Sequence, residues 1–130
     1  MSIVILDYGI GNVKSILNAF EKTGINAILS RERNVIFKAK GIVLPGVGAF
    51  YQGMNNLNKY GLVDIIKEYV KTRKPLLGIC LGMQMLLEES EEFGLTKGIG
   101  LIKGKVIKIP IKESNKIKLP HISWNEIKPK

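Results

Sequence analysis

Histidine and cysteine are nearly absent from this 130-residue chain, which contains one of each, His121 and Cys80. A single cysteine excludes an internal disulfide, so the sequence favours a reducing, cytoplasmic setting. The acidic residues have no histidine near them and do not follow the spacing of a calcium-binding loop. We therefore expect neither a metal nor a cofactor.

Long hydrophobic runs are also missing. No segment approaches the length needed to cross a bilayer, and the N-terminus lacks the charged and apolar regions of a secretory leader. We therefore expect no membrane partner. With 45% hydrophobic and 24% charged residues, the chain has the composition of one globular domain with its own core.

Negative charge is scarce, because 20 lysines and arginines outnumber 11 acidic residues and give a net charge of +9. A surface that binds nucleic acid interleaves basic residues with stacking aromatics. Here aromatic residues make up 7% of the chain and rarely alternate with the lysines. We therefore expect solvated basic faces and no nucleic-acid partner. The densest basic segment, residues 103–118, could face an anionic partner but does not specify one.

Short apolar runs alternate with helical periodicity over the first 87 residues. Strands are predicted at residues 2–6, 26–29, 41–44 and 75–79. Helices are predicted from residue 13 to the C-terminal stop at Gly24, over residues 49–57 and 62–71, and after Cys80, with a helical turn within residues 31–40. Glu88, Glu89, Glu91 and Glu92 are predicted to form a solvated patch at the far end of the last helix.

The pattern changes after residue 98. Isoleucine-rich runs predict strands over residues 99–111 and 117–127, separated by a turn at 113–115. The fold class predicted for residues 1–130 is therefore α/β: a single domain with a doubly wound, mainly parallel, flavodoxin-like sheet and a β-rich C-terminal extension.

Cys80 is the strongest functional candidate, because Gly78 and Gly82 flank it between a predicted strand and a predicted helix. This is the glycine-x-nucleophile-x-glycine pattern, in which a sharp turn holds a reactive side chain clear of the sheet. The backbone N–H of Leu81 would have no helical partner there and could hold an oxyanion. The alternative is a buried structural cysteine, which is the commoner role of a lone cysteine.

Two glycine-containing loops follow predicted strands. Residues 45–48 (Pro-Gly-Val-Gly) could approach a substrate closely and donate N–H groups to an oxyanion, or could be a plain turn. Residues 7–12 end in Asn12, a good helix N-cap. They lack the third glycine of a dinucleotide-binding loop, since Lys14 stands in its place. This second loop is either a tight packing loop or a partner-facing loop.

Five stretches together resemble the glutaminase subunits of imidazole glycerol phosphate synthases, which are class I glutamine amidotransferases. The stretches are residues 7–12 (Asp-Tyr-Gly-Ile-Gly-Asn), 45–50 (Pro-Gly-Val-Gly-Ala-Phe), 78–84 (Gly-Ile-Cys-Leu-Gly-Met-Gln), 98–102 (Gly-Ile-Gly-Leu-Ile) and 120–125 (Pro-His-Ile-Ser-Trp-Asn). The cysteine motif marks the wider amidotransferase class, and the first and last stretches narrow it to this subunit.

The resemblance implies a role for individual residues. Cys80 would be the nucleophile that forms a glutamyl thioester from glutamine, and the N–H groups of Val47 and Leu81 would form the oxyanion hole. The remaining residues that the resemblance assigns would bind glutamine (Gly46, Gly48 and Gln84) or face the partner (Asn12 and Trp124). That partner would be a (β/α)₈-barrel synthase subunit, which receives ammonia and makes imidazole glycerol phosphate in histidine biosynthesis.

One feature departs from the resemblance: the His-Pro-Glu stretch that supplies the base in this family is absent. We therefore expect the 130 residues to be the N-terminal part of a longer family domain and to have little glutaminase activity on their own.

Three alternatives remain open. The subunit could serve a different synthase, such as one that modifies a sugar. It could be a non-catalytic binding module. It could also be a small hydrolase with a Cys80–His121 dyad, which the resemblance disfavours because it places His121 on the structural or partner side.

Overall fold

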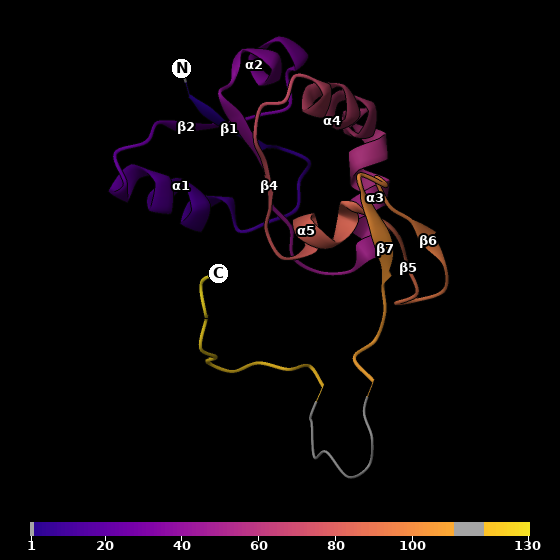
Figure 1. The fold of residues 1–130 in the computed structure, drawn as a ribbon. Helices are drawn as coiled ribbons and strands as arrows, with labels where there is room; N and C mark the ends of the chain where they lie inside the picture. Colours follow the sequence, from indigo (N-terminus) through magenta and orange to yellow (C-terminus); the bar gives the residue numbers. More distant parts are fainter. Residues whose placement is uncertain (1, 111–118) are drawn as a thin grey trace.

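The computed structural model describes residues 2–110 and 119–130, and a four-stranded parallel sheet forms its centre (Figure 1). The strands lie in the order β2, β1, β3, β4, and each neighbouring pair is parallel. Their bounds are β1 Ile3–Leu6, β2 Ala27–Ser30, β3 Gly41–Leu44 and β4 Leu76–Gly78. This arrangement agrees with the doubly wound fold expected from the sequence.

Helices connect these strands across both faces of the sheet. They are α1 Val13–Lys22, α2 Arg33–Lys38, α3 Phe50–Lys59 and α4 Leu62–Lys71, and a further helix, α5 Leu81–Met85, follows β4. Because crossover connections are right-handed, α1 covers one face while α2, α3 and α4 cover the other. Figure 1 shows this separation, with α1 on one side of the sheet and α2 and α4 on the opposite side.

The main core lies between the sheet and helices α2 to α4. Alternate strand residues point into it, as the period of two in a strand requires: Val4 and Leu6 from β1, Ile42 and Leu44 from β3. The helices contribute the buried side chains that their spacing predicts, namely Phe50, Met54 and Leu57 from α3 and Leu62, Ile66 and Tyr69 from α4. The predicted helix periodicities are therefore confirmed on this face.

The opposite face is covered only in part. In the strand register, Leu29, Ile5, Val43 and Leu77 form one row across β2, β1, β3 and β4, which we call the α1-face row. Ile5 and Val43 are 0% and 2% exposed, but Leu29 and Leu77 at the two edges are 42% and 53% exposed. An apolar hollow of about 410 Å³ separates Ile16 and Phe20 of α1 from Leu77. Helix α1 accordingly has no fully buried residue, although it begins at residue 13 as predicted.

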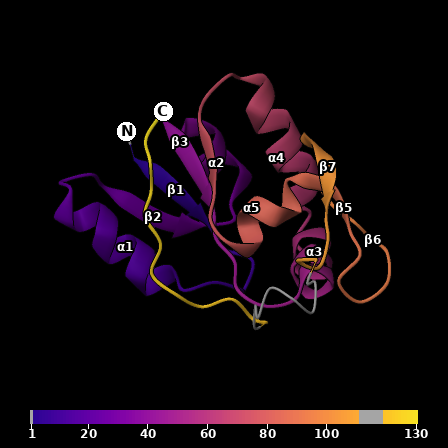
Figure 2. The same ribbon diagram turned by 60° about the horizontal axis from the view of Figure 1, so that its bottom comes forward.

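A second sheet packs beside α3 and α5 (Figure 2). It consists of β5 Leu87–Ser90, β6 Thr96–Lys97 and β7 Ile102–Val106 in the order β6, β5, β7. Strand β5 is antiparallel to β6 and parallel to β7. The β-rich extension was predicted after residue 98, and within the described residues only β7 lies there, since β5 and β6 precede it.

The four glutamates do not lie at the end of a helix, contrary to the prediction. Helix α5 ends at Met85, and the chain enters β5 two residues later. The Glu88 carboxylate accepts a hydrogen bond from Gly104 N at 2.9 Å, and Glu91 forms a 2.6 Å ion pair with Lys105. Glu88, Glu91 and Glu92 are nevertheless exposed, so the predicted solvated surface is confirmed for these three residues, and Glu88 and Glu91 also contact β7.

The predicted C-terminal strands are mostly wrong. Of residues 99–111, the described part forms a strand only at Ile102–Val106. Residues 119–127 form no strand, while residues 117 and 118, the turn at 113–115 and the lysines at 112, 116 and 118 lie outside the described residues. The hydrophobic side chains of the tail, Ile122, Trp124 and Ile127, are almost fully exposed, so the segment has neither a partner strand nor a core to cover. Within the described chain, no helix is both long and apolar enough to cross a membrane.

Candidate active site

Cys80 lies between the end of β4 and the start of α5, in the expected strand-to-helix turn. Its backbone angles are φ 54° and ψ −116°, and its thiol is free and its side chain exposed. A positive φ with this ψ is unfavourable for a residue that has a Cβ, by about 1–3 kcal/mol. The surrounding structure must therefore hold the turn, and the thiol is presented to solvent at the carboxyl edge of the sheet.

The two glycines that flank the cysteine allow a very close approach of main chains. A Cβ on Gly82 would lie 1.9 Å from the carbonyl oxygen of Leu44, and one on Gly78 would lie 2.7 Å from Met83 Cα. No side chain fits at either position. Helix α5 can therefore start directly against the end of β3, where residues 45–48 begin.

The Pro-Gly loop, residues 45–48, touches the start of α5. A Cβ on the buried Gly46 would lie 2.9 Å from Leu81 Cβ and 2.9 Å from Gly82 N. Gly48 has φ 101° with open space around it. Within the described part of the chain, the backbone N–H groups of Val47, Gly48 and Leu81 donate to no other residue. The structure thus brings the Pro-Gly loop, which contains Val47, against Leu81, the residue that follows Cys80.

Gln84, predicted to bind the substrate, lines a hollow of about 580 Å³ on α5. Glu92 and His121 also line this hollow, and its other walls come from Phe93, Val106, Ile107, Lys108, Ile109, Leu119 and Pro120. Glu92 was missed as a site residue, because its glutamate-rich context was interpreted as a solvated surface. Its carboxylate instead accepts a hydrogen bond of 3.1 Å from the backbone N–H of Phe50, at the point where the Pro-Gly loop enters α3.

Tyr8 is a second residue that the sequence analysis did not assign. It is fully buried, and its phenolic hydroxyl donates a hydrogen bond to the carbonyl oxygen of Pro45. Its own carbonyl oxygen accepts a hydrogen bond of 2.9 Å from Asn56 Nδ2 on α3. Burial raises the pKa of the Tyr8 phenol well above its ordinary value, so the hydroxyl remains a donor. An aromatic residue with a polar tip, directly after a buried strand, was the available signal.

The residues predicted to face a partner lie on the surface. Asn12 occupies the N-cap position of α1, but its side chain makes no capping hydrogen bond, which differs from the prediction. The loop that contains it packs on the Pro-Gly loop, since a Cβ on Gly11 would lie 3.0 Å from Pro45 Cβ. Trp124 is fully exposed in the C-terminal tail.

His121 has neighbours in its own segment. Its Nε2 lies 3.2 Å from Ser123 Oγ and 3.5 Å from Asn125 Nδ2. Over residues 2–110 and 119–130 there is no hydrogen bond between His121 and Cys80. The described geometry therefore gives no support to a Cys80–His121 dyad.

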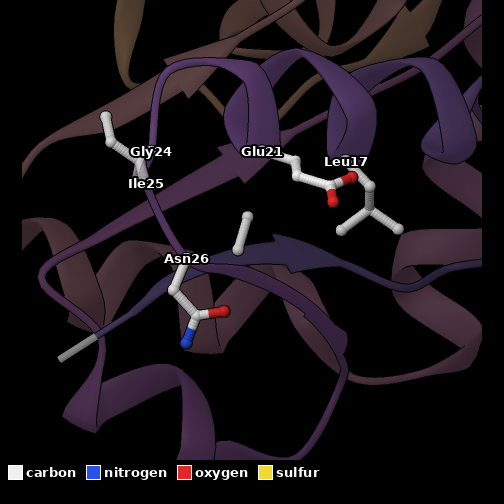
Figure 3. A pocket seen from close by; sticks show the side chains of 6 residues that line it. Leu17, Glu21, Gly24, Ile25 and Asn26 are labelled. Carbon is white, nitrogen blue, oxygen red and sulfur yellow. The ribbon is translucent and has the colours of Figure 1, made fainter.

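A separate hollow of about 500 Å³ lies at the opposite edge of the sheet (Figure 3). It is formed by Leu17 and Glu21 near the end of α1 and by residues 24–27 at the start of β2. Ligands of open α/β sheets bind at the carboxyl ends of the strands, and this hollow lies at an amino end. In the part of the chain that the structure describes, no three potential metal ligands lie together.

Comparison with known proteins gives a consistent result. The family model described as "Glutamine amidotransferase class-I" matches residues 4–126. The chain is 50% identical over 127 residues to "Imidazole glycerol phosphate synthase subunit HisH 2" of Methanococcus maripaludis, covering 97% of this chain and 61% of that protein. It is 45% identical over 126 residues to the subunit HisH of Geobacillus kaustophilus, covering 95% and 60%.

The solved structures add support for the fold. A "Crystal structure of glutamine amidotransferase" superimposes with a TM-score of 0.63 at 22% identity, over 75% of this chain and 52% of that one. At this level of identity the likeness concerns the fold alone. The chain spans about three fifths of the length of the two HisH relatives.

Proposed function

Because the chain belongs to the class I glutamine amidotransferase family, we propose that it forms the nucleophile half of the glutaminase of an imidazole glycerol phosphate synthase. Its substrate is glutamine, and the ammonia that it produces goes to a (β/α)₈-barrel synthase subunit. The product of that partner is imidazole glycerol phosphate, in histidine biosynthesis. Cytoplasmic reductants keep a lone exposed thiol such as Cys80 reduced, so we place its work in the cytoplasm.

The reaction begins when the Cys80 thiolate attacks the side-chain carboxamide carbon of glutamine. The new S–C bond pushes the carbonyl electrons onto oxygen, and the N–H groups of Val47 and Leu81 hold this oxyanion. When the carbonyl re-forms, the C–N bond breaks and the nitrogen leaves as ammonia after it gains a proton. Water then cleaves the glutamyl thioester, releasing glutamate and restoring the thiol.

One observation carries this proposal: the strained, exposed Cys80 lies beside a glycine loop that offers free N–H groups. Gly46 contacts Leu81 and Gly82 so closely that no Cβ fits between them. The Pro-Gly loop and the start of α5 are thus in contact, and we infer that the N–H groups of Val47 and Leu81 converge on one oxygen, as oxyanion stabilisation requires. Gly46, Gly48 and Gln84 are proposed to hold the glutamine, and Gln84 lies on α5, the helix that starts directly after Cys80.

Asn12 and Trp124 are proposed to face the synthase partner. Both are exposed, and the loop of Asn12 packs directly on Pro45 of the Pro-Gly loop. A partner bound at Asn12 would therefore lie one contact away from the proposed oxyanion donors.

The proposal is tested with a glutamine analogue that carries a chloroketone in place of the carboxamide. Intact mass after reaction should show one adduct on the 130-residue chain, absent in Cys80→Ala and prevented by excess L-glutamine but not by D-glutamine. Labelling that L-glutamine does not prevent would contradict a glutamine site. A pull-down with a barrel synthase distinguishes histidine biosynthesis from a synthase that modifies a sugar.

A second candidate is a binding module that occupies the partner without hydrolysing glutamine. The hydrogen-bond neighbours of the one histidine favour it, since His121 contacts Ser123 and Asn125 in its own segment. If Cys80→Ala bound the barrel partner as tightly as the parent chain, and the parent chain showed no competition by L-glutamine, this candidate would replace the first.

A further inference from the structure

Tyr8 connects three parts of the molecule that meet at the candidate active site. Its ring is fully buried at the carboxyl end of β1, and its carbonyl oxygen is held by Asn56 Nδ2 of α3 at 2.9 Å. Its hydroxyl donates to Pro45 O, 37 residues away in the sequence. Both ends of the residue are thus fixed, which leaves the phenol little freedom to move.

The bond falls at the position where the Pro-Gly loop most needs support. Proline has no backbone N–H, so the carbonyl oxygen is the only polar main-chain group with which Pro45 can be held. The same carbonyl is part of the planar peptide group that joins Pro45 to Gly46. Holding this plane in place also restricts the direction of the chain after it. The hydroxyl additionally lies 2.7 Å from the position of a Cβ on Gly46, so it forms one wall of that site.

We propose that the Tyr8 hydroxyl is a positioning group for the oxyanion hole, acting through Pro45 to set the direction of the Val47 N–H. The inference rests on the proposed glutaminase function, because it assigns Val47 as an oxyanion donor. Tyr8 does not touch the substrate in this account. It keeps the Pro-Gly loop against Leu81 and Gly82, so that the donors on the two sides of Cys80 point at the same oxygen.

The same contacts give the amino-terminal loop, residues 7–12, an influence on the site. Gly11 lies against the Pro45 ring, while Tyr8 holds the Pro45 carbonyl oxygen. Residues 7–12 therefore contact Pro45 at both its ring and its carbonyl oxygen. A shift of this loop would move the Pro45–Gly46 peptide, and a displacement of about 1 Å can change a reaction rate up to about a hundredfold.

The test compares two reactions of the Cys80 thiol, one with a reagent whose carbonyl oxygen would occupy the oxyanion hole and one with a reagent that does not need this hole. The L-glutamine chloroketone places a carbonyl oxygen among the proposed donors when it inactivates the protein. Its kinetics give the maximal inactivation rate constant, kinact, and the concentration at half the maximal rate, KI. Alkylation by iodoacetamide is a direct displacement that reports the accessibility and reactivity of the thiol. Tyr8→Phe removes only the hydroxyl. Tyr69→Phe is the matched control, because the buried Tyr69 hydroxyl donates to a carbonyl oxygen, Ala39 O, at 3.1 Å and remote from Cys80.

We expect Tyr8→Phe to lower kinact about tenfold or more, with KI within about twofold and the iodoacetamide rate unchanged. Tyr69→Phe should leave all three values at those of the parent chain. Equal kinact values for the two variants would overturn the Tyr8 role while leaving the glutaminase proposal intact. If the parent chain shows no saturable reaction with the chloroketone, the glutaminase proposal fails and the Tyr8 role falls with it.

If Tyr8→Phe does not fold, a second variant tests the same proposal. Asn56→Ala removes the hydrogen bond to the Tyr8 carbonyl oxygen, so the phenol is retained but is held less firmly against Pro45, and Asn56 is only half-buried. It should lower kinact about threefold in the same direction, again without changing the iodoacetamide rate. A kinact equal to that of the parent chain would overturn the proposal.

Discussion

The carboxylate of Glu92 accepts a 3.1 Å hydrogen bond from the backbone N–H of Phe50, the first residue of α3. Helix α3 has no other cap, since its N-cap residue is Ala49 and its first turn contains no acidic residue. A residue just after β5 therefore supplies the charge that satisfies the helix start. This contact also anchors the point where the Pro-Gly loop ends.

Replacing Glu92 tests this cap. Glu92→Ala should lower the free energy of unfolding by about 1 kcal/mol, whereas Glu92→Gln keeps an acceptor oxygen and should lose about half as much. Urea titration followed by circular dichroism measures both. Glu91→Ala is the control, because Glu91 forms an ion pair with Lys105 that is exposed to solvent and contributes little to stability. Equal losses for Glu91→Ala and Glu92→Ala would contradict a specific cap.

The backbone strain at Cys80 predicts an unusual order of stabilities. Glycine adopts a φ of 54° without penalty, whereas alanine and cysteine do not. Cys80→Gly should therefore be more stable than Cys80→Ala by about 1–2 kcal/mol, and both should lose all reaction with the chloroketone. Thermal unfolding of the three proteins gives the comparison. A less stable Cys80→Gly would show that the turn is relaxed in solution.

The surroundings of His121 predict that the 130-residue chain releases little ammonia from glutamine, even when a barrel partner is present. Departure of ammonia requires a proton donor at the leaving nitrogen. His121 contacts Ser123 and Asn125 and makes no hydrogen bond to Cys80 within the described residues, so it does not supply this proton. A coupled glutamate dehydrogenase assay measures the release. His121→Ala should leave both this rate and the iodoacetamide rate unchanged. Loss of thiol reactivity in that variant would instead support the Cys80–His121 dyad.

Hydrophobic periodicity and glycine spacing predicted correctly those helices and turns that are packed against neighbouring elements. The periodicity around Phe50 and Leu62 predicted α3 and α4 correctly, because their apolar faces pack on the sheet. The glycines around Cys80 similarly predicted the turn, because close approach of main chains permits no other residue there. Strands at residues 119–127 failed, because isoleucine spacing indicates a strand only where a partner strand and a core are available.

Long-range contacts explain why two site residues were missed. Tyr8 and Glu92 bond to main-chain groups 37 and 42 residues away, and local sequence patterns do not identify such distant partners. A glutamate beside three others is typical of a solvated surface, so the contact that Glu92 makes depends on where β5 places it in the fold. Such contacts follow from the topology, which the sequence patterns defined only in outline.

The two buried tyrosines should make the stability of the protein fall in alkaline solution. Burial raises the pKa of both Tyr8 and Tyr69 above the ordinary value of about 10. Below pH 10 both phenols are protonated in both states, so the contribution to stability is complete. Above it the unfolded chain loses protons that the folded chain retains, and stability decreases by up to about 1.4 kcal/mol per pH unit for each tyrosine.

Urea titrations between pH 9 and 11 measure this decrease. Tyr8→Phe should make it shallower, because one phenol that ionises only on unfolding has been removed. Tyr51→Phe is the control, since Tyr51 is exposed. An unchanged pH dependence in Tyr8→Phe would mean that the Tyr8 phenol is accessible to solvent in the folded protein.

The α1-face row predicts which apolar residue limits the solubility of the 130-residue chain. Val43 and Leu77 are register partners on β3 and β4, yet Val43 is buried and Leu77 is half exposed beside the hollow next to α1. An exposed apolar edge favours association of molecules. Leu77→Gln should therefore reduce concentration-dependent light scattering and the binding of a hydrophobic dye, and change the free energy of unfolding by less than about 0.5 kcal/mol.

Val43→Gln is the control, because it places an amide in the core and should lower the free energy of unfolding by about 2–4 kcal/mol. If Leu77→Gln were as destabilising as Val43→Gln, Leu77 would be covered in solution, and the self-association would have to come from another surface.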